Sequence, residues 1–181
     1  MKNLLPSIII CSIFLTSNTK LFAQAVWVTV DNAATHARFD LPTNPAIVDS
    51  LHLTLYNGSV DSLLSLQVHV FDSAYLNTEE QLLSTALQEN EGDTLRAIAH
   101  LIIFATNSEI LSIENITVDE KNGLEIGINY LTLVSDIPTF TFMRYFLFNG
   151  KFIVFSIAGS QDDVPRLLSY KDTFFNSINF Y

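Results

Sequence analysis

Residues 139–160 read TFTFMRYFLFNGKFIVFSIAGS, and their pattern indicates how the protein folds. Apolar residues occupy both sets of alternating positions on each side of Asn149-Gly150, a dipeptide that accepts the positive φ angles of a tight hairpin turn. A strand that is apolar on both sets of positions needs cover on both of its faces. The stretch therefore predicts two antiparallel strands, residues 140–148 and 152–158, at the centre of a sheet buried on both sides.

Three other segments have the apolar spacing of helices that can cover such a sheet. Capping or turn residues mark their starts: Asn77 or Thr78, Gly92-Asp93, and Asp162-Asp163 before Pro165. The second segment is apolar most of the way round, so we expect a deeply buried helix with His100 as a core histidine. A buried strand at residues 101–105 is the competing prediction for part of it.

The remaining strands are predicted from alternation of apolar and polar residues. They cover residues 26–30, 36–41, 51–56, 64–70, 111–118 and 124–130. Asn57-Gly58 predicts a hairpin turn between two strands that each have one apolar and one solvent-exposed face. Lys121-Asn122-Gly123 predicts another turn. A change in alternation near Glu114-Asn115 indicates a bulge. The predicted fold class is α+β, an antiparallel sheet covered by helices.

Composition limits the classes of function. The 181 residues have a formal charge of −10, which argues against nucleic acid as a partner because no excess of cations can displace counterions from phosphates. Cys11 is the only cysteine, and it lies in residues 1–23, which we expect to be cleaved off as a signal peptide. The remaining chain can therefore form no disulfide and use no thiolate. We see no repeat and no linker, which predicts one domain over residues 24–181.

Residues 1–23 have the organisation of a signal peptide. Lys2 gives a short positive start, an apolar run follows, and small residues allow cleavage after Ala23 or Ala25. The apolar run is too short for a permanent membrane span, and no run of about 20 apolar residues follows it. We expect a periplasmic or secreted protein, with a leader of the style found in Gram-negative bacteria of the Bacteroidetes type.

The closing part of the chain resembles the PsbP family, which is named after an extrinsic photosystem II subunit. The likeness lies in residues 144–151, the apolar strand that follows, and residues 174–180, FFNSINF; near the front, residues 39–45, FDLPTNP, resemble the family's opening. The resemblance implies a PsbP-like α/β/α sandwich. The family includes photosystem accessory subunits, a nuclear import factor that binds a small GTPase, and secreted bacterial proteins of unknown role. No shared catalytic set unites its members, so the resemblance implies no catalytic residue here.

Motifs of phosphate loops, nucleophile elbows and zinc proteases are absent from the sequence. The nearest group to a metal site is His36, His52 and His69, with Asp40 and Asp72 as further ligands. If the hairpin turn is centred between residues 59 and 60, His52 lies diagonally across from His69. The simpler interpretation is that these histidines bind no metal and are solvated on the solvent-exposed faces of their strands. The acid pairs Glu79-Glu80 and Asp162-Asp163 are interpreted as helix N-terminal residues rather than as a glycosidase pair.

The sequence therefore predicts an accessory or protein-interaction domain without catalysis, with no cofactor and with another envelope protein as its partner. The alternative is a carrier of a small apolar ligand, because the phenylalanine-rich strand pair can line a cleft between sheet and helices. A hydrolase that uses a carboxylate or a histidine is the third hypothesis.

Overall fold

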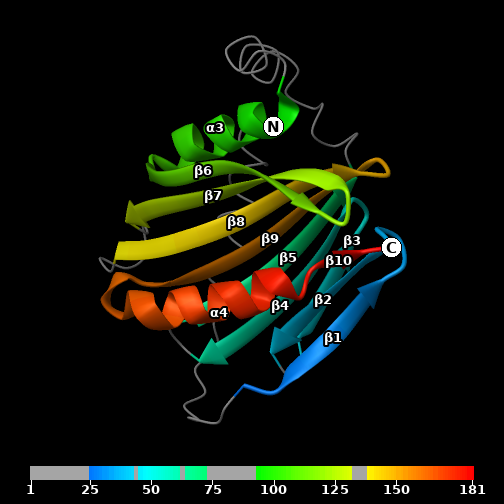
Figure 1. Ribbon diagram of the computed structural model, residues 1–181, viewed down its shortest axis with the longest axis horizontal. Helices are drawn as coiled ribbons and strands as arrows, with labels where there is room; N and C mark the ends of the chain where they lie inside the picture. Colours follow the sequence, from blue (N-terminus) through cyan, green and yellow to red (C-terminus); the bar gives the residue numbers. More distant parts are fainter. Residues whose placement is uncertain (1–24, 43–44, 62–63, 73–92, 132–137) are drawn as a thin grey trace.

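The computed structural model describes residues 25–42, 45–61, 64–72, 93–131 and 138–181. These residues form one large and one small antiparallel sheet and two α-helices (Figure 1). Among the described residues, no helix is long and apolar enough to cross a membrane. The predicted helix over residues 78–87 lies outside the described residues.

The large sheet has seven strands. In sheet order they are β3 (Ala46–Ser50), β4 (Leu53–Asp61), β5 (Leu64–Asp72), β9 (Lys151–Ser160), β8 (Pro138–Phe148), β7 (Lys121–Leu131) and β6 (Glu109–Val118). Every neighbouring pair is antiparallel. β9 lies at the centre and β8 beside it, as the apolar pattern of residues 139–160 predicts.

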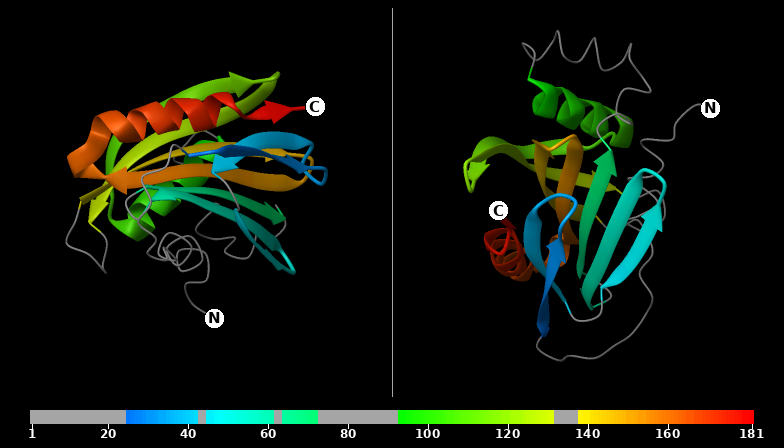
Figure 2. Two further views of the ribbon diagram at one scale, coloured as in Figure 1. Left: turned by 90° about the horizontal axis from the view of Figure 1, so that it is seen from below. Right: turned by 90° about the vertical axis from the view of Figure 1, so that its right-hand side faces the viewer.

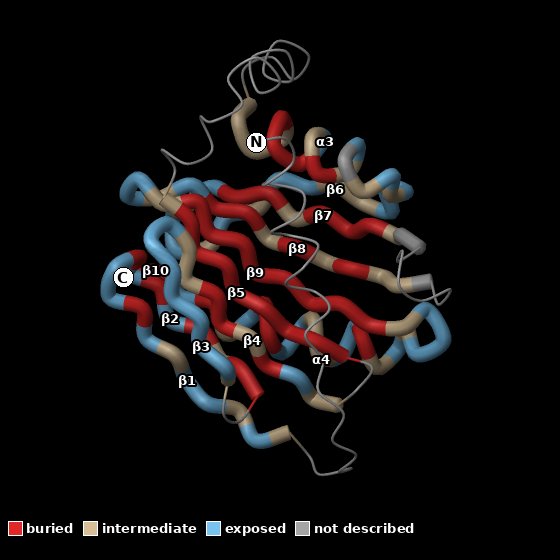
Figure 3. The backbone as a smooth tube through the Cα atoms, turned by 180° about the vertical axis from the view of Figure 1, so that it is seen from behind, coloured by how far each residue is buried: buried red, intermediate tan, exposed pale blue. Residues whose placement is uncertain are grey.

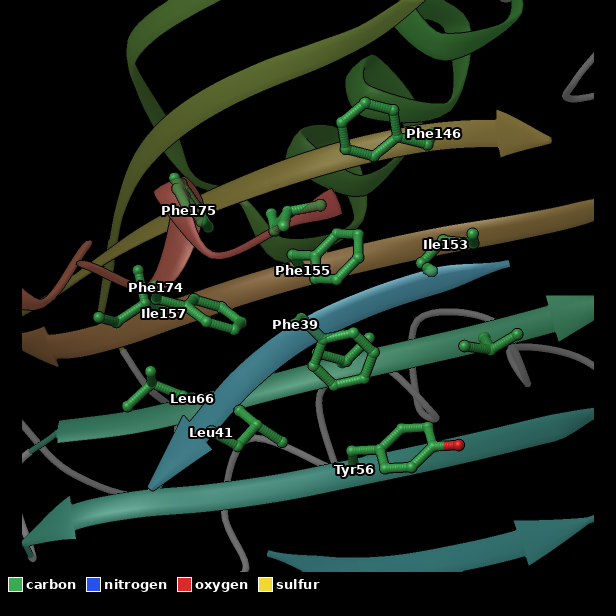
Figure 4. Close-up of a cluster of buried hydrophobic side chains, with 14 of the residues drawn as sticks. Phe39, Leu41, Tyr56, Leu66, Phe146, Ile153, Phe155, Ile157, Phe174 and Phe175 are labelled. Atoms are coloured by element: carbon green, nitrogen blue, oxygen red, sulfur yellow. The ribbon is translucent and has the colours of Figure 1, made fainter. Parts of the chain in front are cut away.

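A smaller sheet and one helix cover the first face of the large sheet (Figure 2). The small sheet consists of β1 (Trp27–Asn32), β2 (Ala37–Pro42) and β10 (Asn179–Phe180), in the order β1-β2-β10. Helix α4 (Val164–Asn176) follows a 3₁₀ turn at Gln161–Asp163, as the predicted start at Asp162-Asp163 indicates. Figure 4 shows the core between these layers, where Phe39 of β2 packs edge-on against Phe155 of β9.

Helix α3 (Thr94–Thr106) covers the opposite face, on β7 and β8. Its N-cap is Asp93, whose carboxylate accepts a hydrogen bond from the backbone N–H of Arg96. Ile98 and Ile102 pack in the second core cluster. The large sheet therefore lies between α4 with the small sheet on one side and α3 on the other. This is the predicted α/β/α sandwich of class α+β.

Two details of α3 differ from the prediction. Phe104 is 87% exposed and His100 is exposed, so the helix buries one side only. The expectation of deep burial is wrong because Ile98 and Ile102 occupy the side of the helix that faces the second core cluster, whereas His100 and Phe104 lie on the opposite side. The competing prediction of a strand at residues 101–105 is also wrong, because α3 continues to Thr106.

The turns of the strand pairs also correct the sequence analysis. Asn57-Gly58 lies inside β4, whose pairing with β5 continues to Asp61, and the bulge in β6 falls between Ile110 and Ser112. Asn122-Gly123 lies inside β7, and the positive φ angles belong to Asp119 and Glu120 instead. The predicted turn at Asn149-Gly150 is confirmed, with φ angles of 51° and 69°.

Candidate functional site

A polar groove of about 210 Å³ opens where the β3–β4 turn and β5 meet the start of β9. His52 in that turn, Asp72 at the end of β5 and Lys151 at the start of β9 contribute ionisable side chains to its wall. The strand register brings the three residues together. Asp72 pairs directly with Lys151, and the backbone N–H of Asp72 donates a hydrogen bond to the carbonyl of His52 at 3.2 Å.

Asp72 is the centre of the ionic contacts in this groove. Its carboxylate accepts a hydrogen bond from the Lys151 ammonium, and the His52 Nδ1 atom lies 3.5 Å from its other oxygen. The hydrogen bonds from Lys151 and His52 lower the pKa of Asp72. An ionised carboxylate with two such partners orients cationic groups and is a poor proton donor near neutral pH.

The neighbouring wall of the groove is formed by Tyr56 on β4 and Asn32 at the end of β1. The Asn32 amide donates a hydrogen bond to the Tyr56 hydroxyl oxygen at 2.9 Å, and its own carbonyl oxygen accepts from the backbone N–H groups of Ala34 and Thr35. Burial and the charge of Asp49 raise the pKa of Tyr56. The Asn32–Tyr56 hydrogen bond therefore links the small sheet to the large one beside the groove.

His69 lies on β5 but faces away from this groove. Its neighbour on β5, Val70, lines the groove, and successive side chains along a strand point to opposite faces. Burial lowers the pKa of His69 to about 4, so the imidazole is neutral near pH 7. Its Nε2 atom lies 3.2 Å from the Gln67 side-chain oxygen.

The predicted geometry of the histidine group is therefore wrong. β4 and β5 remain paired up to Asp61 and Leu64, so the turn is not centred between residues 59 and 60, and this register places His52 opposite Asp72 instead of diagonal to His69. His36 lies in the turn before β2, where its ring meets that of Tyr181 edge-on. Across the described ranges, no group of three or more His, Cys, Asp or Glu side chains can hold a metal ion.

The carboxylates singled out in the sequence lie apart from one another. Asp40 is on β2, where it accepts a hydrogen bond from the Thr29 hydroxyl at 2.7 Å. Asp162 and Asp163 precede α4, as their interpretation as helix N-terminal residues requires. The pair Glu79-Glu80 lies outside the described residues.

The edge strand β3 is the most exposed strand of the large sheet, as the burial colours of Figure 3 show. All five of its residues are exposed, and Ile47 and Val48 retain 55% and 54% of their surface. Leu51, in the turn that follows, is 88% exposed. This strand was not predicted from the sequence, because the strand predicted before it ends at Leu41, ahead of Pro42 and Pro45, and the next predicted alternation begins at Leu51.

A second, smaller cavity of about 20 Å³ lies on the α3 side of the large sheet, over β5, β9 and β8. Both apolar and polar side chains line it, including Ile102 of α3 and the hydroxyl residues Ser65, Thr141 and Ser156. The phenylalanines expected to line a ligand cleft lie mostly on the other face, where Phe146 and Phe155 are fully buried in the core beneath α4 and the small sheet.

The arrangement of layers is shared with a solved protein. The solution structure of cyanobacterial PsbP (CyanoP) from Synechocystis sp. PCC 6803 matches with a TM-score of 0.58, over 92% of this chain and 99% of that one. The chain has a PsbP-like fold. At 15% identity, the match to CyanoP establishes the fold alone.

Two further solved structures match less well. A protein of unknown function from Pseudomonas aeruginosa, PA94, matches with a TM-score of 0.44 at 6% identity, over 81% of this chain and 91% of that one. LpqN of Mycobacterium tuberculosis, described as involved in cell envelope biogenesis, matches with a TM-score of 0.48 at 8% identity, over 87% of this chain and 91% of that one. No family model matches the sequence, and none of the curated proteins matches it significantly. The roles of individual residues are therefore inferred from the geometry of this chain and not transferred from a relative.

Proposed function

We propose that this chain is an accessory domain that binds another protein of the cell envelope and carries out no catalysis. The observation that carries the proposal is the exposed edge strand β3. An edge strand presents one row of backbone N–H and C=O groups that its own sheet does not pair, and such a row accepts an additional strand.

β3 has few of the features that protect edge strands. It pairs with β4 in continuous register from Ala46 to Ser50, and Asp49 is the only charged residue in it. Natural edge strands are commonly protected by lysines, bulges or covering segments. The exposed apolar side chains of Ile47 and Val48 therefore fit a strand that is covered in a complex.

The partner that fits this edge is an extended segment that carries apolar side chains with basic residues beside them. The chain has a formal charge of −10, and Asp49 lies on the edge strand itself. Complementary charge brings partners together faster and disfavours acidic competitors. Acidic segments and nucleic acids are therefore poor partners.

We further propose that residues 1–23 are a signal peptide and that the domain acts in the periplasm or after secretion. Both proposed cleavage points, after Ala23 and after Ala25, precede β1, which begins at Trp27. Cleavage at either point leaves every described strand intact. N-terminal sequencing of protein isolated from its natural cells tests this: a start at Gln24 or Val26 agrees with the proposal, and a start at Met1 contradicts it.

Variants of the edge strand test the binding function. Ile47→Lys places a cation on β3, where it repels a basic partner, and Leu168→Lys on the exposed side of α4 is the matched control. In extracts of the natural cells, the wild-type chain and Leu168→Lys should migrate at the same size, above that of the free chain, and Ile47→Lys should migrate as the free chain. A complex that survives Ile47→Lys contradicts a role for β3.

A second candidate function is the carriage of a small ligand, favoured by the cavity on the α3 side of the sheet. Its lining combines apolar side chains such as Ile102 and Val154 with the hydroxyl groups of Ser65 and Thr141. This combination is typical of small-molecule sites, in which a few polar groups orient a ligand within an apolar wall.

A further inference from the structure

The cavity on the α3 side is built from three successive cross-strand rows of β5, β9 and β8. The first row is Ser65, Ala158 and Thr141, the second is Gln67, Ser156 and Met143, and the third is His69, Val154 and Tyr145. The three rows point to one face of the sheet, because they are two residues apart along each strand.

In the first row, a small residue separates two hydroxyl groups. Ala158 carries only a methyl group, while Ser65 and Thr141 stand on either side of it on the neighbouring strands. Adjacent strands are about 4.8 Å apart, so the two flanking Cα atoms are separated by about 10 Å. Ser65, Ala158 and Thr141 all line the cavity, so a ligand above Ala158 lies between the two hydroxyl groups.

A ligand in this position would supply both hydroxyl groups with a hydrogen-bond partner. Ser65 and Thr141 are buried, with 8% and 1% of their surface exposed, and neither hydroxyl oxygen has a hydrogen-bond partner within the described residues. Ser156 differs, because its hydroxyl donates to the Gln67 backbone carbonyl at 3.5 Å. Burial of a hydroxyl group without a partner costs about 1–3 kcal/mol, so native proteins normally supply one.

The residues that line the cavity disfavour charged ligands. Among the described residues that line it there is no Asp, Glu, Lys or Arg, and its histidine, His69, is neutral near pH 7 because burial lowers its pKa to about 4. An ion that enters would lose its hydration without gaining a counterion. The volume of about 20 Å³ is enough for about one water molecule.

We propose that Ser65 and Thr141 form a binding site for a small uncharged molecule with a hydroxyl or amide group, bound above Ala158. The apolar end of the ligand extends along the second and third rows and displaces the side chain of Met143, whose thioether chain adapts readily to a neighbour. The inference rests on the second candidate function and not on the edge strand β3.

Met143 supplies a reporter for this site. The chain contains two methionines, Met1 and Met143, so protein labelled at the methionine methyl groups gives two signals, and a Met143→Leu variant assigns the relevant one. The probe is 1-propanol, with propylammonium and propionate as charged controls of similar shape. In the wild-type protein, 1-propanol should shift the Met143 methyl signal in a saturable way, and the two ions should not.

Two variants remove the hydroxyl groups without enlarging the cavity much. Ser65→Ala and Thr141→Val should each raise the Kd for 1-propanol about fivefold, the loss expected for one hydrogen bond. Ser169→Ala on the exposed side of α4 is the control and should leave the Kd unchanged. Both cavity variants replace a buried polar group by an apolar one of similar volume, so they should fold.

Three results would overturn the inference: a shift that does not saturate, an equal shift with propylammonium, or an unchanged Kd in both cavity variants. None of them bears on partner binding through β3. Conversely, loss of the complex in Ile47→Lys with normal 1-propanol binding leaves the cavity site intact, so the two proposals fail separately.

Discussion

Glu125 on β7 holds α4 against the large sheet, and its replacement by glutamine should destabilise the protein. Its side chain is 14% exposed; it accepts a hydrogen bond from Arg144 of β8 at 2.8 Å and one from Lys171 of α4 at 2.6 Å. Arg144 also donates to the backbone carbonyl of Phe175 at the end of α4 at 2.9 Å. Glu125 therefore connects three elements through two cations.

The magnitude follows from these contacts. A hydrogen bond to a charged group contributes about 1.5–3 kcal/mol, and glutamine retains one acceptor oxygen but no charge. Glu125→Gln also leaves the positive charges of Arg144 and Lys171, both mostly buried, without a counterion. We expect a loss of about 2–3 kcal/mol in the free energy of unfolding at pH 7, which lowers Tm by roughly 5–10 °C.

The pH dependence has a defined sign. Burial alone raises the pKa of Glu125, but the hydrogen bonds and charges of Lys171 and Arg144 outweigh it, so the folded-state pKa lies below the ordinary value of 4.5. The stabilisation is therefore complete above about pH 4.5 and is lost as the pH falls through the folded-state pKa. The difference between wild type and Glu125→Gln should shrink toward zero in that acidic range.

Urea unfolding followed by circular dichroism at several pH values measures this difference. The control is Glu114→Gln, which changes an exposed glutamate that pairs with Glu125 across β6 and β7 and should alter stability by less than about 0.5 kcal/mol. Equal stability of wild type and Glu125→Gln at pH 7 would contradict a stabilising role of Glu125. A difference that persists unchanged at pH 3 would refute the electrostatic part of it.

Three further predictions concern single residues. Gly123→Ala should cost about 1–3 kcal/mol in urea unfolding, because a Cβ atom there would lie 2.5 Å from the ring of the fully buried Phe146. Gly150→Ala should cost about 1–2 kcal/mol in the same assay, because φ is 69° at that turn position; an equal stability of either variant and wild type would contradict the assigned geometry. His69 should titrate near pH 4 in an NMR titration of the histidine rings. The free energy of unfolding should fall as the pH drops from about 6.5 to 4, because in that range the unfolded state takes up a proton at His69 and the folded state does not. A His69 ring that titrates near 6.5 would contradict its burial.

The three Asn-Gly pairs show what the sequence can predict about turns. All three have the signature of a hairpin turn, yet only Asn149-Gly150 forms one. Gly58 and Gly123 lie inside strands, where a Cβ atom would meet the Pro42 ring at 2.9 Å and the Phe146 ring at 2.5 Å. Such close approaches come from residues distant in sequence, so local turn chemistry cannot reveal them.

The central strand pair was predictable because its own residues are apolar on both sets of positions. The groove was not, because it depends on register. His52, Asp72 and Lys151 come from three strands or their turns, and a hairpin turn placed a few residues too early sends His52 to the wrong neighbour. Nothing near Lys151 in the sequence indicates that it pairs with Asp72.

The most direct test of the proposed function is photo-cross-linking from β3 in the natural cells. A benzophenone amino acid at position 48 replaces Val48, which is 54% exposed on the edge strand, and the same group at position 168 on α4 is the control. We predict one cross-linked partner from position 48, joined through an extended segment with basic residues, and none from position 168. Equal products from both positions, or none from position 48, would contradict a partner-binding role for this edge.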